Sequence, residues 1–215
     1  MNRDIPFYSV LTPDQQDLLD RTIHRASYKK GQVVHAHGDP CVGLIVVHKG
    51  RLDFSTISEE GREIILYRAG EGETCILSAA CIFQGMEAEN LITAETAVEV
   101  SIFPAATLAR LMAENPDVER IVYKLAVAQY TAVQRNMQRI IFLSLEKRLA
   151  VFLREESLRR KQMTFSATHE YIARCIGSSR EVVTRMLNQF AARNIVSLGR
   201  GTVTVLDRDA LFDLT

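Results

Sequence analysis

The stretch "THEYIARCIGSSREVVTRMLNQF", from Thr168 to Phe190, has the spacing of two short helices joined by a tight turn. Thr168 stands where a residue caps the first helix, and Gly177 stands where the turn needs a positive φ, which costs glycine least. Apolar residues then recur at helical spacing on one side of each helix. They are Ile172, Ala173 and Ile176 in the first helix, and Val182, Val183, Met186, Leu187 and Phe190 in the second. The stretch therefore predicts a helix-turn-helix.

The second helix carries four polar residues opposite its apolar side, namely Arg180, Glu181, Thr184 and Arg185. Arginine bonds guanine bidentately, glutamate accepts from cytosine, and threonine meets a thymine methyl or a phosphate. Recognition helices read bases mainly from their N-terminal residues. We therefore expect these four residues, here called the reading face, to contact bases. The alternative is that Ser178 and Glu181 form a capping box and that the two arginines are only solvated.

The residues around this stretch are suited to a phosphate backbone. "NIVSLGRGTVTVLD" (Asn194–Asp207) predicts two strands around the turn Gly199–Gly201, here called the wing. Arg193 and Arg200 are placed there to touch phosphate, which gives affinity without sequence information. The expected backbone contacts are Thr168, Ser179, Asn188 and Arg200. Residues 135–215 hold 14 Lys+Arg against 8 Asp+Glu, a balance of +6, whereas residues 1–134 hold 12 against 18, a balance of −6. Double-stranded DNA is the expected partner of the basic part.

The N-terminal half has a different character. Glycines split short β-branched runs between Gly31 and Leu77, and "NLITAETAVEVSIF" (Asn90–Phe103) predicts two further strands. This pattern predicts an antiparallel β-roll over residues 28–104. Ahead of it, Thr12 and Gln15 predict a capping box for a helix in Thr12–Ala26.

Residues 117–143 contain no Gly or Pro and predict a long helix. A stripe at 3-4 spacing fits a seam between two such helices in a homodimer. It comprises Val118, Val122, Leu125, Gln129, Ala132 and Asn136. The alternative is a helix that lies on its own domain through Ala126, Val133, Met137 and Ile140. Both arrangements are compatible, because the two stripes lie on adjacent faces.

These elements predict an α+β chain in three parts. Residues 1–116 form a β-roll domain with flanking helices, 117–143 a dimerisation helix, and 144–215 a winged helix-turn-helix domain. No apolar run reaches the roughly 20 residues of a membrane helix, and the start lacks an apolar signal segment, so we expect a cytoplasmic protein without a membrane partner. The sequence has no P-loop, no GxGxxG and no GxSxG, and "HEYIA" lacks the second histidine of HExxH. Cupin metal sites need several histidines and a glutamate, which are not evident here, so we expect no enzyme.

On these motifs the chain resembles the Crp/Fnr family of bacterial transcription regulators, over roughly residues 10–210. The most specific piece is "IGSSREVVTR" (Ile176–Arg185). Arg180, Glu181 and Arg185 match the R-E-x-x-x-R pattern of cyclic-AMP receptor proteins. Glu181, Thr184 and Arg185 match the E-x-x-S-R pattern of the Fnr branch, with threonine for serine. The resemblance implies a sensory β-roll like a cyclic-nucleotide-binding domain, a homodimer on inverted TGTGA- or TTGAT-like half-sites, and RNA polymerase as a partner.

The resemblance also implies an effector pocket, and this chain departs from the family there. The corresponding positions are Gly72, Glu73, Thr74, Cys75, Ala88, Glu89, Val133 and Gln134. Cyclic-AMP receptors hold the phosphate with an Arg-Ser pair, replaced here by Ala88 and Glu89, and contact adenine with a Thr-Ser pair, replaced by Val133 and Gln134. A carboxylate would repel the phosphate, so the sequence argues against cyclic AMP. The first 40 residues contain no cysteine, which argues against the iron–sulfur cluster of Fnr.

Two groups of cysteine and histidine side chains allow a signal other than a cyclic nucleotide. Cys75 and Cys81 in "TCILSAAC" form either a thiol sensor or soft-ligand site, or are small buried side chains. His35, His37 and Cys41 lie close in sequence. They form a site for a metal or haem iron, or they are solvated side chains. Without a secretion signal we expect all four cysteines to be reduced. The effector thus stays unidentified, with thiol-redox or haem sensing as the alternative.

Overall fold

The computed structural model describes residues 5–36, 38–83 and 91–214. It divides the chain into two units, which are described separately. The first unit comprises Met1–Thr56 and Leu66–Gln134, and the second comprises Ile57–Ile65 and Arg135–Thr215. The three-part division expected from the sequence stays a prediction.

The first unit opens with the 3-10 helix η1 (Tyr8–Val10) and helix α1 (Pro13–Thr22). The Thr12 hydroxyl accepts a hydrogen bond from the Gln15 backbone N–H, and the Gln15 side chain accepts one from the Thr12 N–H. This confirms the predicted capping box, which satisfies two donors that the first turn of a helix leaves without partners.

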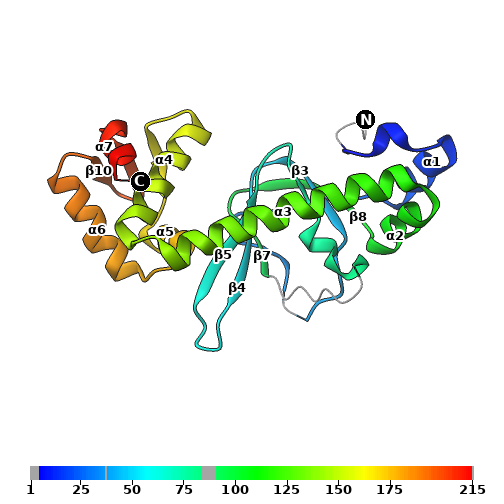
Figure 1. The fold of residues 1–215 in the computed structure, drawn as a ribbon, viewed down its shortest axis with the longest axis horizontal. Coiled ribbons are helices and arrows are strands. Elements are labelled where there is room, and N and C mark those ends of the chain that lie inside the picture. The colour runs from blue at the N-terminus through cyan, green and yellow to red at the C-terminus, as the bar shows by residue number, and fades with distance from the viewer. Residues whose placement is uncertain (1–4, 37, 84–90, 215) are drawn as a thin grey trace. The chain divides into compact units, whose positions relative to one another are not determined.

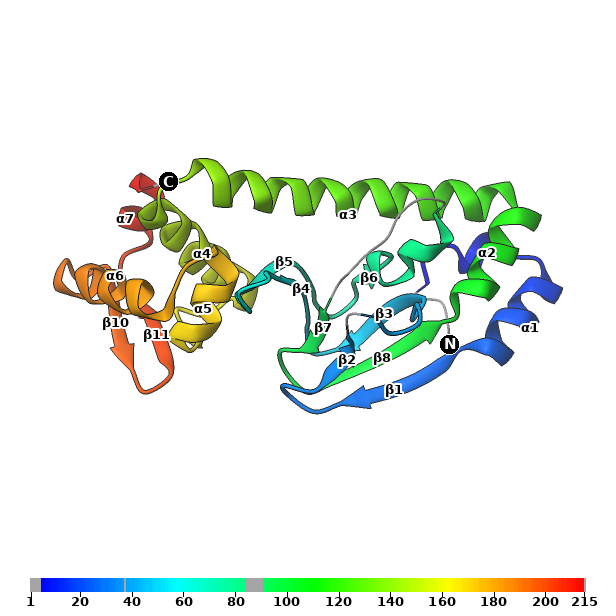
Figure 2. The same cartoon turned by 90° about the horizontal axis from the view of Figure 1, so that it is seen from below.

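Two four-stranded antiparallel sheets follow, as the glycine-split pattern predicted. Their strand orders are β1-β8-β3-β6 and β2-β7-β4-β5. The strands are β1 (His24–Tyr28), β2 (Val33–His35), β3 (Leu44–Lys49), β4 (Leu52–Ile57), β5 (Glu63–Ala69), β6 (Thr74–Cys75), β7 (Leu91–Ala94) and β8 (Val98–Phe103). Ile45 and Val47 of one sheet and Phe54 and Ile92 of the other belong to one buried cluster. The two sheets therefore pack face to face around a common core (Figures 1 and 2).

Strand β3 is buried on both sides, which explains its uninterrupted apolar run. Its alternate residues Leu44 and Val46 belong to a second cluster, together with side chains of the helices that cover the sheet. These elements are η2 (Leu77–Ile82), α2 (Ala105–Glu114) and α3 (Pro116–Phe142). The long helix α3 matches the predicted span 117–143 closely.

The second unit contains the hairpin tip Ile57–Ile65, the end of α3, and the following helices and strands. These are α4 (Leu145–Arg160), β9 (Thr164–Ser166), α5 (His169–Ile176), α6 (Arg180–Ala192), β10 (Val196–Gly199), β11 (Thr202–Val205) and α7 (Arg208–Asp213). The three strands pair antiparallel in the order β10-β11-β9, and Figure 2 shows the β10–β11 hairpin beside α6. Helix α7, which Asp207 caps, has no counterpart in the sequence prediction.

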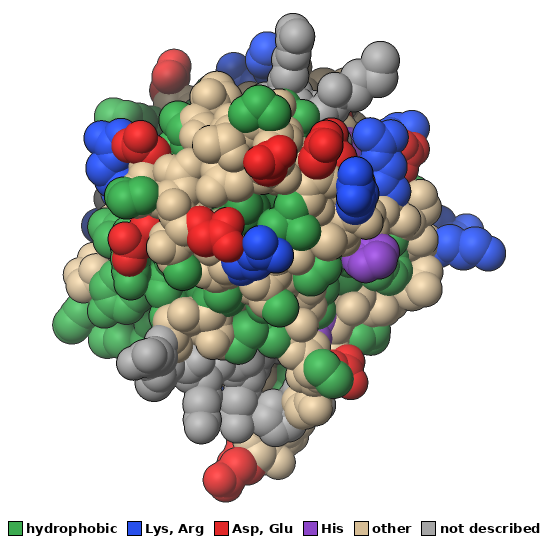
Figure 3. All heavy atoms as spheres, turned by 90° about the vertical axis from the view of Figure 1, so that its right-hand side faces the viewer, with side chains coloured by type: hydrophobic (Ala, Val, Ile, Leu, Met, Phe, Trp, Pro, Cys, Tyr) green, Lys and Arg blue, Asp and Glu red, His purple; other side chains and the backbone are tan. Residues whose placement is uncertain are grey.

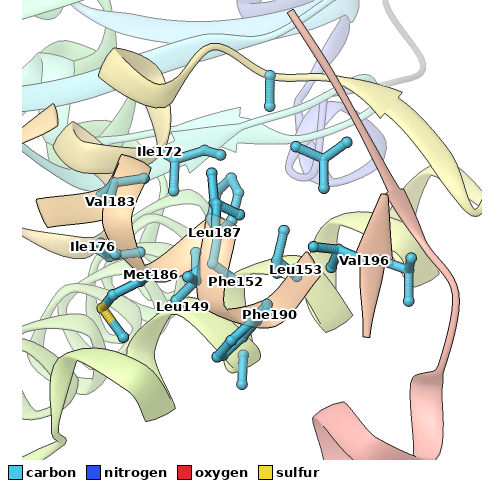
Figure 4. Close-up of a cluster of buried hydrophobic side chains, with 14 of the residues drawn as sticks. Leu149, Phe152, Leu153, Ile172, Ile176, Val183, Met186, Leu187, Phe190 and Val196 are labelled. Carbon is cyan, nitrogen blue, oxygen red and sulfur yellow. The ribbon is translucent and has the colours of Figure 1, made fainter. Parts of the chain in front are cut away.

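The core of the second unit lies between α4, α5, α6 and the small sheet (Figure 4). Leu149 and Leu153 of α4 are fully buried, as are Ile172 of α5 and Val183 and Leu187 of α6. The predicted apolar sides of the two short helices are thus confirmed, with Val182 only partly buried. Because the core is densely packed, it fixes the orientation of α6 within the second unit.

Among the described residues, no helix combines the length and the apolar character needed to cross a bilayer. On the face drawn in Figure 3, acidic and basic side chains are interspersed among apolar ones.

Candidate nucleic-acid interface and sensory cassette

The turn between α5 and α6 has the geometry that the sequence predicted. The Thr168 hydroxyl accepts from the Tyr171 N–H at 3.1 Å and caps α5. Gly177 ends α5 with φ +64°, in the left-handed region that favours glycine. The Ser179 hydroxyl then caps α6 by accepting from the Val182 N–H at 3.4 Å. Two capped helices and one left-handed glycine therefore fix the direction in which α6 leaves the turn.

The reading face lies on the exposed side of α6. Arg180, Glu181 and Arg185 are exposed, and within the described residues no side-chain hydrogen bond or ion pair occupies them. The cap of α6 is Ser179, so the alternative capping box between Ser178 and Glu181 does not form. Two guanidiniums and a carboxylate thus remain available at the first turn and a half of the helix.

Thr184 differs from its neighbours on this face. Its hydroxyl donates to the Arg180 carbonyl oxygen at 2.8 Å, and its Oγ1 lies 2.8 Å from Nδ1 of His169 on α5. Because the hydroxyl proton is used by the carbonyl, the imidazole N–H donates in this pair. Thr184 therefore keeps its methyl group and one oxygen lone pair for an external partner. Sequence reasoning missed this role of His169.

The expected backbone contacts are spread around α6. Thr168, Ser179 and Asn188 are exposed, and Arg200 lies exposed in the wing turn between β10 and β11. Arg193 is different, because its guanidinium pairs with Glu146 at 2.8 Å. Its charge is therefore partly neutralised within the unit, and the expected contact of Arg193 with phosphate stays a prediction.

Two arginines also donate hydrogen bonds to backbone carbonyl oxygens of the turn between α5 and α6. Arg62 of the hairpin tip donates to the Gly177 carbonyl oxygen at 2.8 Å, and Arg148 of α4 donates to the Ile176 carbonyl oxygen at 2.7 Å. Burial, and next the neighbouring Arg62, lower the pKa of Arg148. Both carboxylate oxygens of Glu63 accept from Nη1 of Arg174 at 2.9 Å. The carbonyls that end α5 are thereby satisfied by side chains far away in sequence.

In the first unit, strand β6 and the N-cap residue of η2 (residues 74–76), here called the cassette, are bonded to a glutamine of α3. The side chain of Gln129, which is 4% exposed, accepts from the Ile76 N–H at 2.9 Å and donates to the Thr74 carbonyl oxygen. The Cys75 thiol lies 3.7 Å from the same glutamine oxygen. Strand β6 is therefore bonded directly to α3.

Of the expected pocket residues, only some lie together at this place. Thr74 and Cys75 contact Gln129, whereas Glu73 accepts from the Gly70 N–H at 2.7 Å and Gly72 has φ +80° in the turn. Val133 is half-buried and Gln134 is exposed. Ala88 and Glu89 lie outside the described residues. Burial, followed by Glu73 and Cys75, raises the pKa of the nearby Tyr67, so its phenol stays protonated.

Comparisons with known proteins bear on both units. Residues 147–214 match the model of the Crp-like helix-turn-helix domain, and residues 25–115 match that of the cyclic nucleotide-binding domain. A Crp/Fnr-family structure from Eubacterium rectale is 35% identical, covers 99% of this chain and 98% of its own, and superposes with a TM-score of 0.92. The chain belongs to the Crp/Fnr family. It has the fold of a DNA-binding transcription regulator of that family, as the sequence predicted.

Curated Crp/Fnr relatives are more distant. The fumarate and nitrate reduction regulatory protein of Yersinia pestis is 27% identical over 98% of this chain and 85% of its own length. The CRP-like cAMP-activated global transcriptional regulator of Mycobacterium tuberculosis is 23% identical over 90% of this chain and 88% of its own length. The first name refers to fumarate and nitrate reduction and the second to activation by cAMP, so the two names do not indicate one signal for this Crp/Fnr chain.

The cysteines of this Crp/Fnr chain depart from the expectation that all are reduced. Cys41 and Cys81 form a disulfide, whereas Cys75 and Cys175 keep their thiols. The sequence grouped Cys75 with Cys81, either as a thiol or soft-ligand site or as small buried side chains. Cys75 is buried beside Gln129, whereas Cys81 is exposed and bonded to Cys41. His37 lies outside the described residues, and among the described residues no three His, Cys, Asp or Glu side chains are grouped as metal ligands.

The stripe of α3 that was expected to form the dimer seam lies mostly against the chain's own units. Val118, Val122 and Gln129 are buried in the first unit, and Leu125 packs against the same cluster. These positions are taken by their own unit, as is Asn136, which donates to the Ile65 carbonyl oxygen at 2.9 Å in the second unit. Ala132 is half-buried.

The outward stripe of α3 is another one. It consists of Tyr123, Val127, Tyr130, Gln134, Met137 and Ile141, at alternating steps of four and three. Its apolar members are 47–66% exposed. The alternative in which the helix lies on its own domain predicted a buried Met137, and for this residue it was wrong. Periodicity alone could have found this stripe, since it fits a heptad repeat as well as the first did.

Proposed function

We propose that this protein is a homodimeric, sequence-specific transcription regulator that reads an inverted repeat through the reading face of α6. The observation that carries the proposal is the exposure of Arg180, Glu181 and Arg185 on a capped helix, without interactions inside the described part of the chain. Removing such side chains from water and ordering them costs free energy. Hydrogen bonds with a partner are needed to offset that cost. Guanine and cytosine edges in the major groove offer the complementary groups.

The half-site is inferred from the resemblance of these side chains to the reading patterns of the family, which implies TGTGA or TTGAT. The chemistry of two arginines and a glutamate is compatible with the G·C pair in the GA step that both half-sites contain. Thr184 adds a preference for a thymine methyl, because its hydroxyl proton is used by the Arg180 carbonyl. Thr168, Ser179, Asn188 and Arg200 provide backbone contacts that set the register.

The dimer proposal uses the outward stripe of α3. Tyr123, Val127 and Tyr130 are about half exposed or more, and a second copy supplies the same stripe by two-fold symmetry. Two recognition helices then meet half-sites one helical turn apart. A regulator of this kind acts in the cytoplasm, with RNA polymerase as its further partner.

The effector is proposed to be a small signal other than cyclic AMP. At the cassette, Gln129 bonds the backbone of β6, and the sequence carries no Arg-Ser pair for a cyclic phosphate. Thiol-redox sensing is the second candidate, and the Cys41–Cys81 disulfide favours it. The haem alternative has no comparable support.

Operator binding tests the proposal. Fluorescence anisotropy would compare duplexes that carry inverted TGTGA or inverted TTGAT half-sites with a scrambled duplex of equal composition. Wild type should prefer one palindrome, and Arg180→Ala and Arg185→Ala should each lose about 1–3 kcal/mol of that preference, or roughly 5–150-fold.

Arg208→Ala is the matched control, since it removes an equally exposed guanidinium from α7. It should keep the preference. If wild type does not distinguish the palindromes from the scrambled duplex, or if the control loses as much as the two variants, the reading face is assigned incorrectly.

A further inference from the structure

The Cys41–Cys81 disulfide lies on the surface of the first unit. Both residues are exposed, and they are 40 positions apart in the chain, with a Cα–Cα distance of 6.3 Å. Exposed disulfides are open to reductants and are the labile or regulatory ones, in contrast to buried structural bridges. A regulator that works on DNA inside a cell meets a reducing environment, where a lasting disulfide is unusual and a redox-sensing one is typical. The inference thus rests on the proposed function.

The site also accommodates the reduced pair. The sulfur of Cys41 lies 3.5 Å from the Ser78 carbonyl oxygen, which can accept a weak hydrogen bond from a thiol at that place. The same carbonyl accepts from the Gly43 N–H at 3.2 Å. The loop before β3 is therefore attached to η2 by polar contacts as well as by the disulfide.

A short chain of contacts links the disulfide to α3. Cys81 belongs to η2, and Ser78 in the same 3-10 helix donates from its hydroxyl to the Cys75 carbonyl oxygen at 3.0 Å. The next residue, Ile76, donates its N–H to Gln129 of α3. The covalent bond thus fixes one end of a segment whose other end is bonded to the long helix.

We propose that Cys41 and Cys81 are a reversible thiol–disulfide site, oxidised by a peroxide, that sets how firmly η2 and β6 are held to α3 and thereby the affinity for DNA. One thiolate attacks a peroxide oxygen, the O–O bond breaks, and a sulfenic acid and one water form from hydrogen peroxide. The second thiol attacks that sulfur, the S–O bond breaks, and a second water leaves. The two sulfurs lose two electrons in total, and the peroxide gains them. A thiol reductant reverses the reaction by disulfide exchange.

Thiol counting tests the site itself. Full-length protein is reduced, treated with hydrogen peroxide, denatured and alkylated, and the alkylated cysteines are counted by mass spectrometry. The count should fall from four to two in wild type, and the loss should be absent in Cys41→Ser and in Cys81→Ser. Cys75→Ser and Cys175→Ser are matched controls that should still lose two thiols. Oxidation that requires Cys75, or an unchanged count in wild type, overturns the proposal.

Hydrogen exchange and DNA binding test the consequence. The peptide that covers Thr74–Phe83 should exchange at least about threefold faster in the reduced protein, and affinity for the preferred palindromic duplex should differ at least about fivefold between the two states. Cys41→Ser should show neither difference. Equal exchange and equal affinity in both states overturn the switch. If thiol counting and exchange respond but neither state distinguishes operator from scrambled DNA, the proposed function fails, and with it the link of the switch to DNA.

Discussion

At the start of α6, two arginines and a glutamate extend away from their own unit, whereas at β6 the polar groups of the cassette are bonded to a glutamine of α3. Arg180, Glu181 and Arg185 of the reading face are exposed, and Gln129 is almost completely buried. Both regions are polar patches on an apolar framework. They differ in where their partners are. Arg180, Glu181 and Arg185 have no side-chain partner among the described residues, whereas the partner of β6 lies inside the chain.

This difference explains why one region indicates the class of its ligand and the other does not. A polar side chain without an internal partner must be explained by solvent or by a ligand, and its chemistry then indicates the ligand class. A polar side chain with an internal partner is already explained by folding, since a buried group needs its hydrogen bonds. The side chains of the DNA-binding region therefore indicate the class of their partner. Those of the cassette mainly show how the first unit is stabilised.

The strongest test of the comparison is Gln129→Leu. It leaves the Ile76 N–H and the Thr74 carbonyl oxygen without their buried partner, and each loss costs about 1–3 kcal/mol. We expect the free energy of unfolding of the first unit to fall by about 2–4 kcal/mol in urea titrations.

Gln138→Leu is the matched control, because it changes an exposed glutamine on the same helix. It should stay within about 0.5 kcal/mol of wild type. Equal effects of the two substitutions would mean that β6 does not depend on Gln129.

Local signals in the sequence predicted the local structure well. Thr12, Thr168 and Gly177 were assigned to caps and a turn from their immediate neighbours, and the structure places them there. Such features depend on residues three or four positions apart, which a sequence displays directly. The framework of strands and helices followed for the same reason.

Pairings between distant residues could not be predicted in this way. Cys41 and Cys81 are 40 positions apart, and the sequence grouped Cys81 with the nearer Cys75 and predicted no disulfide. Two stripes of α3 fit a 3-4 spacing, and only the tertiary structure shows that Val122 and Gln129 face their own unit. Periodicity finds the faces of a helix but does not tell which face meets which surface.

The outward stripe of α3 gives the next test, with an intermediate effect. Val127→Glu should fold normally, because the side chain is 65% exposed in its own subunit. In the proposed dimer it would bring two carboxylates into an apolar seam, so the dimer dissociation constant should rise at least about tenfold, or 1.4 kcal/mol, in analytical ultracentrifugation. Ala128→Glu adds the same charge on an exposed position away from the stripe and should have little effect. A monomeric wild type would refute the seam.

The smallest expected effect belongs to Arg200 in the wing. It is exposed like Arg185, but it lies in the turn between β10 and β11 and not on α6. If it contacts a phosphate, Arg200→Ala should weaken binding to operator and scrambled duplexes by the same factor. The slope of log K against log salt should become shallower by about 0.9. Titrations of both duplexes at four salt concentrations would measure this, with Arg185→Ala as the contrasting variant that changes the ratio between duplexes. A changed ratio for Arg200→Ala would place Arg200 among the base-reading residues, because a phosphate contact carries no sequence information.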